Sequence, residues 1–313
     1  MSSRFLVTGG AGFIGSHLVR ALLARGDAVS VLDDLSTGKE SNLEGVAGPL
    51  TFHRGSVADA AAVERAIDGC RGVFHIAALP SVTRSVSHPV ESHHANVTGT
   101  VTVLHAAAKC GARVVYAGSS SAYGDQDAPA KHEMLREDPL SPYAATKLAG
   151  ELYCRSFAKV YGLDAVVTRF FNVFGPRQTA DSPYSGVIAA FCHALLHGRS
   201  PRIDGDGRQS RDFTYVEDVV LGVLCAMDAR TKGCEVVNIA YGSSITLLEL
   251  LDVLQGLAGT SLEPTWAQPR SGDVRHSLAD VTRASNLLGY RPKVGFAEGI
   301  RRTFDWYRSQ IKS

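Results

Sequence analysis

A glycine-rich turn close to the first residue constrains the fold of this chain more than any other segment. Gly9, Gly12 and Gly15 follow the apolar run at 5–7 and open a segment with helical spacing. Glycines are needed where a strand turns tightly into a helix and a phosphate approaches the backbone. The helix N-terminus then offers free N–H groups and a partial positive charge to that phosphate. The spacing therefore predicts a dinucleotide site in the first βαβ unit.

Short β-rich runs alternate with helical patterns through the first half of the chain, which is typical of βαβ units and a parallel sheet. A single core stops growing at about 250–300 residues, and this chain has 313. We therefore predict an α/β fold with two lobes. A Rossmann-type doubly wound parallel sheet covers 1–172 and binds the dinucleotide. A smaller C-terminal α/β lobe over 173–313 binds the substrate, and segments near 213–245 return to the first domain. The expected strands are 5–7, 28–32, 50–53, 72–76, 113–116 and 165–168, and the expected helices are 13–25, 59–68, 92–110, 142–161 and 187–197.

The overall charge and the cysteines argue against several classes of protein. Lys and Arg number 32, Asp and Glu number 31, and the resulting net charge of +1 argues against a nucleic-acid partner. The six cysteines form neither a CxxC pair nor a zinc-ligand spacing, so we expect reduced thiols, no metal and a cytoplasmic location. We recognise no signal peptide, and the longest apolar stretch, 219–227, is shorter than the roughly 18 residues of a membrane span.

An aspartate at the end of the second expected strand favours NAD over NADP. Asp33 stands where an acid accepts hydrogen bonds from the adenosine ribose hydroxyls and repels a 2′-phosphate. The alternative, an N-cap or a solvated loop acid, suits Asp34 better. No Arg or Lys follows until Lys39, which weakens the case for NADP.

A tyrosine and a lysine form the predicted catalytic pair. Tyr143 and Lys147 are four residues apart, so a helix places them on one face and brings the ammonium near the phenol. A neighbouring cation would lower the pKa of the phenol from about 10 toward the working pH. The serine run 119–121 follows the fifth expected strand, where ligands bind in parallel sheets. By itself such a pair is more often an exposed surface pair, and the order of glycine turn, serine run and pair favours catalysis.

These segments together resemble the extended short-chain dehydrogenase/reductase family and, within it, the nucleotide-sugar 4-epimerases. The resemblance covers essentially the whole chain and implies an enzyme that uses NAD to epimerise a UDP-sugar through a 4-keto intermediate, without net redox. The motifs that carry it are TGGAGFIGSH at 8–17, DDLSTG at 33–38, HIAAL at 75–79, NVTGT at 96–100, SSSAYGD at 119–125, SPYAATK at 141–147, RFFNVFGPRQ at 169–178, GDGRQSRDFTYVEDV at 205–219 and RSGDVRHSLAD at 270–280.

The resemblance implies a role for each matching residue. Tyr143 is the acid and base, Lys147 is its electrostatic partner, and Ser119 is the catalytic hydroxyl. For Arg211, whose planar fork suits a diphosphate, the alternative is a surface ion pair with Asp212. The implied NAD contacts are Gly9, Gly12, Phe13, Ile14, Gly15, Asp33, Ser36, Thr37, Gly38, Ser56, Val57, Ala77, Ala78, Leu79, Asn96, Tyr143, Lys147 and Phe170. The implied UDP-sugar contacts are Ser81, Ser120, Ser121, Asn172, Val187, Arg211, Arg270, Asp273 and Ser277.

Three positions refine this expectation. The family usually carries Asp after Gly55, in contact with adenine, and this chain carries Ser56. Related dehydratases and decarboxylases carry acids directly after the catalytic hydroxyl, whereas here Ser120, Ser121 and Ala122 follow, which favours simple epimerisation. Ser277 matches a position beside the sugar 2-substituent, where a small residue leaves room for an N-acetyl group. We therefore expect UDP-N-acetylglucosamine and UDP-N-acetylgalactosamine as substrates, with UDP-glucose and UDP-galactose possible.

Several alternatives stay open from the sequence. A UDP-glucuronate 4-epimerase would need a cation near the sugar C6, for which Arg84 and Arg177 are candidates. A net dehydrogenase or reductase would use the same Tyr143 and Lys147 but would release NADH. A non-catalytic NAD sensor would not need Ser119, Tyr143 and Lys147, so their presence counts against it. The excess of apolar positions on helices 92–110 and 142–161 matches the family's dimeric four-helix bundle, so we expect a homodimer.

Overall fold

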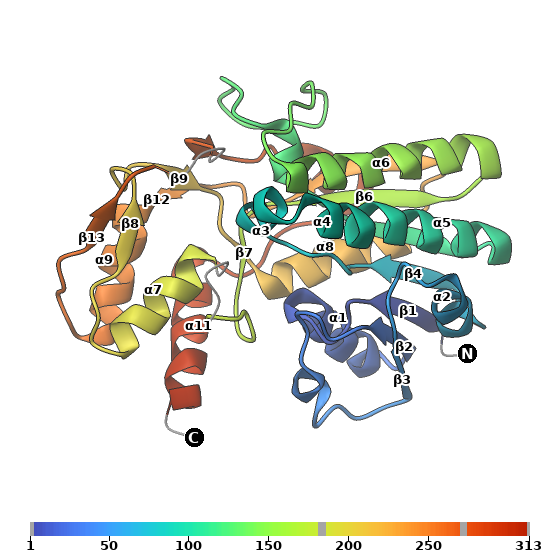
Figure 1. The fold of residues 1–313 in the computed structure, drawn as a ribbon, viewed down its shortest axis with the longest axis horizontal. Coiled ribbons are helices and arrows are strands. Elements are labelled where there is room, and N and C mark those ends of the chain that lie inside the picture. The colour runs from blue at the N-terminus through green and yellow to red at the C-terminus, as the bar shows by residue number, and fades with distance from the viewer. Residues whose placement is uncertain (1–2, 181–185, 270–273, 312–313) are drawn as a thin grey trace.

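A seven-stranded parallel sheet forms the centre of the larger lobe, on the right of Figure 1. The computed structural model describes residues 3–180, 186–269 and 274–311. The strands lie in the order β11-β6-β5-β4-β1-β2-β3, and all of their pairings are parallel. The expected doubly wound Rossmann-type sheet is therefore confirmed. The strands are β1 (Arg4–Thr8), β2 (Ala28–Asp33), β3 (Leu50–Arg54), β4 (Gly72–His75), β5 (Arg113–Ser119), β6 (Ala165–Phe170) and β11 (Cys234–Ile239).

Helices cover both faces of this sheet because its central strands are apolar on both sides. Val114 and Val115 of β5 are both fully buried, and they belong to the cores on opposite faces. One core includes side chains of α1 (Phe13–Ala24), α8 (Val216–Asp228) and α10 (Thr282–Leu288). The other includes side chains of α2 (Ala60–Ile67), α5 (Gly99–Cys110) and α6 (Pro142–Tyr161).

The helix that carries the predicted catalytic pair has its ends set by local sequence. The Ser141 side chain accepts a hydrogen bond from the Ala144 N–H, and Pro142 occupies the first turn, where its missing N–H costs nothing. Gly162 ends the helix with a φ of 68°, in the left-handed region that glycine adopts most readily. The observed bounds of α6 match the expected 142–161.

The expected helix 92–110 is not one continuous α-helix. It consists of α4 (Pro89–His93), a π-helical turn (His94–Thr98) and α5. The Thr100 hydroxyl donates to the Asn96 carbonyl within this segment. A π-turn inserts one residue into the α-helical register, which periodicity averaged over a long segment does not reveal. Shorter helical segments are α3 (Val82–Ser87) and the 3₁₀ turns at Glu40–Leu43 and Ser120–Tyr123.

The smaller lobe has its own core of helices packed on short strands. Its helices are α7 (Val187–Leu196), α9 (Leu247–Ala258) and α11 (Phe296–Ile311), and α9 begins with a reciprocal capping box between Thr246 and Glu249. The strands pair as β7 (Val173–Phe174) with β10 (Thr214–Tyr215), β8 (Arg202–Asp204) with β13 (Thr265–Ala267), and β9 (Ser210–Arg211) with both β12 (Ile245–Thr246) and β14 (His276–Ser277).

The chain crosses between the lobes more than once. After β10, α8 packs against α1, and β11 then adds to the large sheet beside β6. Figure 1 shows α8 next to α1 in the larger lobe, and α7, α9 and α11 grouped on the left of the molecule. Among the described residues, no helix combines the length and the apolar character that crossing a membrane requires.

Candidate active site

The glycine turn joins β1 to α1 at the place where the strand order reverses, between β1 and β4. Gly9 has a φ of 69°, and a Cβ there would lie 2.8 Å from the backbone of Ala77. A Cβ at Gly15 would overlap the Gly9 carbonyl oxygen. Ligands bind at such switch points in open α/β sheets. The turn is thus built for close approach of backbone to backbone and of backbone to a ligand.

Asp33 holds this turn together. One of its carboxylate oxygens accepts the Ala11 N–H at 2.9 Å, and the other accepts the Leu35 N–H at 2.9 Å. Burial raises the pKa of Asp33, and these two N–H bonds oppose the rise. Leu35 has a φ of 60°, an uncommon conformation for leucine. Asp33 therefore shapes the loop that follows β2 as well as presenting an acid at its end.

The expected cofactor residues of the next loops lie around the same edge of the sheet. Ser36 and Thr37 are exposed, and Gly38 approaches Ala11 closely enough that a Cβ would meet its carbonyl carbon at 3.0 Å. The Ser56 hydroxyl accepts the Ala58 N–H at 3.2 Å, so it orders the start of the turn before α2. Val57 is buried beside Gly99.

Asn96 acts on the 77–79 turn through its side chain. Its Oδ1 accepts the Leu79 N–H at 2.8 Å, and its Nδ2 donates to the Thr146 hydroxyl at 3.0 Å. Both amide groups of Asn96 are thereby engaged with protein. The side chain fixes the turn after β4 against α6, one residue before Lys147.

Tyr143, Lys147 and the serine run meet at the carboxyl end of β5. The Ser119 hydroxyl contacts the Ser121 hydroxyl at 2.8 Å and caps the 3₁₀ turn that contains Ser120. The Lys147 ammonium donates to the Ala117 carbonyl at 2.8 Å and lies 5.1 Å from the ring centroid of Tyr116. The hydroxyl of Ser119 comes from the end of β5, and the phenol of Tyr143 and the ammonium of Lys147 come from α6, which packs against β5.

The expected lowering of the Tyr143 pKa is wrong for this structure. Burial raises the pKa of the Tyr143 phenol, and a hydrogen bond with the Ser119 side chain opposes that rise. Burial also lowers the pKa of Lys147 to about 8. The physical reason is desolvation, which disfavours both the phenolate and the ammonium, while the ammonium donates to a backbone carbonyl.

The expected substrate residues lie where the two lobes join. Phe170, an expected NAD contact, ends β6 in register with Ser119, and Asn172, an expected substrate contact, follows with a φ of 21°. Ser277 is buried and is in register with Arg211 across β14 and β9. Ser81 caps α3 and Val187 begins α7. The expected contacts Arg270 and Asp273 lie outside the described residues.

The alternative ion pair between Arg211 and Asp212 receives no support from the geometry around the acid. The Asp212 carboxylate accepts the N–H groups of Tyr241, Gly242 and Ala279 at 3.0–3.3 Å. Burial raises the pKa of Asp212 to about 6. Asp212 therefore ties together three backbone segments of the smaller lobe.

Sequence reasoning missed a buried charge network beneath α6. Arg169 of β6 is fully buried and donates to Glu151 of α6 at 2.7 and 2.9 Å and to Glu137 at 2.8 Å. Its guanidinium lies 4.5 Å from the ring centroid of Tyr123. The network connects β6, α6 and the loop before α6. Its signal was an Arg inside an apolar strand, a position that requires a charged partner.

Two further side chains, those of Ser85 and His75, hold elements of the site in place. The Ser85 hydroxyl accepts the Tyr143 N–H at 2.9 Å and thereby holds the first turn of α6. His75 is fully buried and bridges the hydroxyls of Thr8 at 2.7 Å and Thr100 at 3.0 Å. Burial lowers the pKa of His75 to about 3, so its ring is neutral at ordinary pH.

The residues at the switch point fit a dinucleotide cofactor. No side chain caps the N-terminus of α1, so its first N–H groups are available to an anion. Gly12, at that N-terminus, carries no side chain that would shield them. Asp33 lies at the end of the next strand, at the ribose position of such sites.

Comparison with known proteins agrees with this geometry. Residues 5–240 match the NAD dependent epimerase/dehydratase family. The chain is 40% identical over 312 residues to a UDP-glucose 4-epimerase of Mycolicibacterium smegmatis, covering 98% of this chain and 99% of that protein.

Two solved structures show the same fold. The UDP-N-acetylglucosamine 4-epimerase from Methanobrevibacter ruminantium M1, in complex with UDP-N-acetylmuramic acid, superposes with a TM-score of 0.94 at 37% identity and covers 99% of this chain and 100% of its own. The UDP-glucose 4-epimerase of Thermus thermophilus, in complex with NAD, has a TM-score of 0.88 at 39% identity, and the match covers 97% of this chain and 99% of that one. The chain therefore belongs to the NAD-dependent epimerase/dehydratase family, and NAD is its cofactor.

Proposed function

We propose that this enzyme interconverts the C4 epimers of UDP-N-acetylhexosamines and accepts UDP-hexoses as second substrates. The observation that carries the sugar preference is Ser277. Its side chain is small, it is buried, and β14 holds it in register with Arg211, the proposed diphosphate ligand. A small residue there leaves room for a 2-acetamido group.

In the proposed reaction, bound NAD supplies a reversible hydride acceptor for the sugar C4. Tyr143 holds and returns the proton of the sugar 4-oxygen, and the Ser119 hydroxyl hydrogen-bonds that same oxygen. Lys147 supplies a buried positive charge beside the 117–119 strand end. Phe170, in register with Ser119, forms the wall next to the reacting ring.

The absence of acids after Ser119 supports epimerisation over elimination within this family. Ser120, Ser121 and Ala122 occupy the 3₁₀ turn that follows β5. Glu137, which lies in the loop before α6, is ion-paired with Arg169 and Arg155. An engaged carboxylate of this kind is poorly suited to remove a proton from a substrate.

The UDP-glucuronate alternative receives less support. Arg84, one candidate for the C6 carboxylate, is ion-paired with Glu91 at 3.4 Å. Arg177, the other candidate, contacts His17 and lines a separate cavity beside α1.

We also propose that the protein is a homodimer, that 1–172 is the main NAD-binding part and 173–313 the main UDP-sugar part, and that the enzyme is cytoplasmic. The dimer is supported by large apolar side chains exposed along α6, namely Leu152, Tyr153, Val160 and Tyr161. The location is supported by six cysteines that are all free thiols.

Ser277→Tyr tests the sugar preference. We expect turnover of UDP-N-acetylglucosamine to fall at least about tenfold, because steric overlap in a packed site costs about 1–3 kcal/mol. UDP-glucose turnover should persist. The measurement is product separation after incubation with each sugar, and Ser277→Ala serves as the matched small variant that keeps both activities. Unchanged UDP-N-acetylglucosamine turnover in the tyrosine variant would remove Ser277 from the role of gate.

A further inference from the structure

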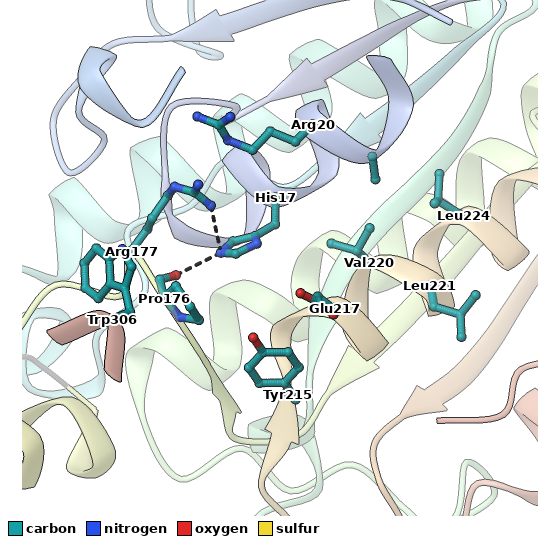
Figure 2. A pocket seen from close by; sticks show the side chains of 11 residues that line it. His17, Arg20, Pro176, Arg177, Tyr215, Glu217, Val220, Leu221, Leu224 and Trp306 are labelled. Atoms are coloured by element: carbon teal, nitrogen blue, oxygen red, sulfur yellow. Dashed lines mark hydrogen bonds between the residues drawn. The ribbon is translucent and has the colours of Figure 1, made fainter. Parts of the chain in front are cut away.

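A cavity of about 650 Å³ lies between α1, α8 and α11, outside the site described above. Basic side chains from two distant segments line it, namely His17 and Arg20 of α1 and Arg177 of the loop after β7. Figure 2 shows these three side chains at one end of the cavity and Val220, Leu221 and Leu224 of α8 along another side. No residue of the glycine turn and neither member of the Tyr143–Lys147 pair lines it.

Within the described part of the chain, the guanidinium of Arg177 has no matching acceptor. Nε2 of His17 lies 2.9 Å from the Pro176 carbonyl oxygen and 3.3 Å from Nη1 of Arg177. A ring nitrogen that donates its hydrogen to the carbonyl cannot also accept one from Arg177. The carbonyl contact is the shorter, so it takes the hydrogen and leaves the two donors facing each other. Among the described residues, no ion pair involves Arg177.

Arg20 adds a second positive charge with an unused donor. Its Nη2 donates to the carbonyls of Asn42 and Glu44, and its buried Nε has no partner. The charges of Arg20 and Arg177 both lower the pKa of His17, which burial brings to about 4, and Arg20 also lowers that of Arg177. Both arginines line the same cavity as His17, and Figure 2 shows their side chains at one end of it.

Of the residues that the structure describes, the one acid that lines the cavity does not neutralise them. Glu217 is ion-paired with Arg302 at 3.2 Å. Like charges that share a cavity without a counter-charge among the described residues are costly, and a phosphate relieves that cost while accepting from the planar fork of Arg177. The apolar side, formed by α8 and Trp306, suits a ring rather than a second charge.

We propose that this cavity binds a phosphate monoester that carries a planar ring, with its phosphate on Arg177 and Arg20 and its ring against Trp306 and α8. Its size falls within the range of small-molecule sites, about 300–1,000 Å³. The ligand would be held beside the part of α1 that carries His17 and Arg20, which follows the glycine turn along the chain. This inference is independent of which sugar the enzyme epimerises.

Tryptophan fluorescence gives a direct test, since the chain has two tryptophans and only Trp306 lines the cavity. The Trp266→Phe protein is saturated with NAD and UDP so that AMP has no access to the cofactor and substrate sites. AMP is then titrated as the probe. We expect a saturable change in Trp306 fluorescence, with a Kd on the order of 1 mM or tighter. Adenosine and inorganic phosphate should each bind at least about tenfold more weakly than AMP.

Substitutions in the same background separate the cavity from nonspecific binding. Arg177→Gln should weaken the affinity for AMP at least about tenfold. The affinity of Arg177→Lys should lie between that of Arg177→Gln and that of the parent, because lysine keeps the positive charge but lacks the planar guanidinium. Arg301→Gln is the matched control, since Arg301 is exposed, paired with Glu298 and absent from the cavity lining. Far-ultraviolet circular dichroism of each variant confirms that it is folded. Absence of a saturable signal up to about 10 mM AMP, or equal affinity in Arg177→Gln, or equal affinity for adenosine, would overturn the proposal.

Discussion

At the scale of single residues, burial decides the protonation chemistry of the proposed catalytic pair. Both groups sit in a desolvated environment that favours their neutral forms, which raises the pKa of Tyr143 and lowers that of Lys147 to about 8. These shifts move the two pKa values apart from their ordinary 10.0 and 10.5, so the phenol holds its proton more tightly than the ammonium does. In the proposed reaction, Tyr143 is therefore the group that carries the proton, and Lys147 is the group that supplies a nearby positive charge.

Replacement of Tyr143 by Phe tests the proton carrier. We expect turnover to fall about 10²–10⁴-fold, because the phenol is the proposed acid and base and such groups contribute in that range. The fold and NAD binding should be retained, since Tyr143 contributes its backbone N–H, not its hydroxyl, to the bond with Ser85. The checks are the epimerisation rate and the NAD content after purification. A near-native rate would exclude Tyr143 from the mechanism.

Replacement of Asp33 by Ala tests the selection of NAD over NADP. The carboxylate is the proposed partner of the ribose hydroxyls, and it also holds the N–H groups of Ala11 and Leu35. We expect NAD affinity to fall at least about tenfold, since a hydrogen bond to a charged group contributes about 1.5–3 kcal/mol. Discrimination against NADP should also decrease. Direct titration with both cofactors measures this.

Asp34 offers the matched control. It is exposed, and its carboxylate accepts the Ser36 N–H within its own loop. Asp34→Ala should leave the ratio of NAD to NADP affinity close to that of the wild type. A wild-type protein that binds NADP more tightly than NAD would show the assignment to be wrong.

At the scale of elements, α6 serves two surfaces. Its buried side carries Lys147 and Glu151, which face β5 and β6. Its outer side leaves the apolar side chains of Leu152 and Val160 exposed to solvent by 51% and 69%. This exposed apolar face of α6 is the surface on which the proposed dimer rests.

Introducing charge on that face tests the proposed dimer. The double variant Leu152→Glu/Val160→Glu should have the mass of a single chain in sedimentation equilibrium, whereas the wild type should have the mass of two. Buried unpaired carboxylates are too costly for the interface to tolerate. Val253→Glu, at an apolar position of α9 in the smaller lobe that is 38% exposed, should remain dimeric. A wild type that is monomeric at micromolar concentration would contradict the proposal.

At the scale of the whole molecule, buried histidines couple stability to pH. The folded pKa of His75 is about 3, against 6.5 for an unperturbed histidine. The unfolded chain therefore binds a proton below pH 6.5 that the folded chain refuses, so the stability due to the neutral ring is lost as the pH falls. Asp212 acts in the opposite direction, because its folded pKa of about 6 lies above the ordinary 3.8.

Comparing the pH dependence of stability of the wild type with that of His75→Asn separates the contribution of His75 from that of groups such as Asp212. Between pH 6.5 and 4.5, the free energy of unfolding of the wild type should fall about 2 kcal/mol more than that of the variant. Urea unfolding at each pH measures the difference. Parallel pH profiles for the two proteins would show that His75 takes up its proton without unfolding.

Features that depend on neighbours along the chain could be predicted from the amino-acid sequence alone. The spacing of glycines required a strand-to-helix turn, and alternation of apolar runs with helical patterns required a parallel sheet. Ser141, Pro142 and Gly162 set the ends of the helix that carries Tyr143 and Lys147. These signals are local, because turns, caps and helical faces involve residues at most a few positions apart.

Features that depend on distances between remote segments became visible in the folded chain alone. The direction of the Tyr143 pKa shift follows from burial. The partner of Lys147 is a carbonyl 30 residues away, and that of His17 is a carbonyl 159 residues away. The clustering of Arg20 with Arg177 likewise joins α1 to a loop of the other lobe. Burial and charge proximity depend on how the elements pack, which periodicity and spacing along one chain do not encode.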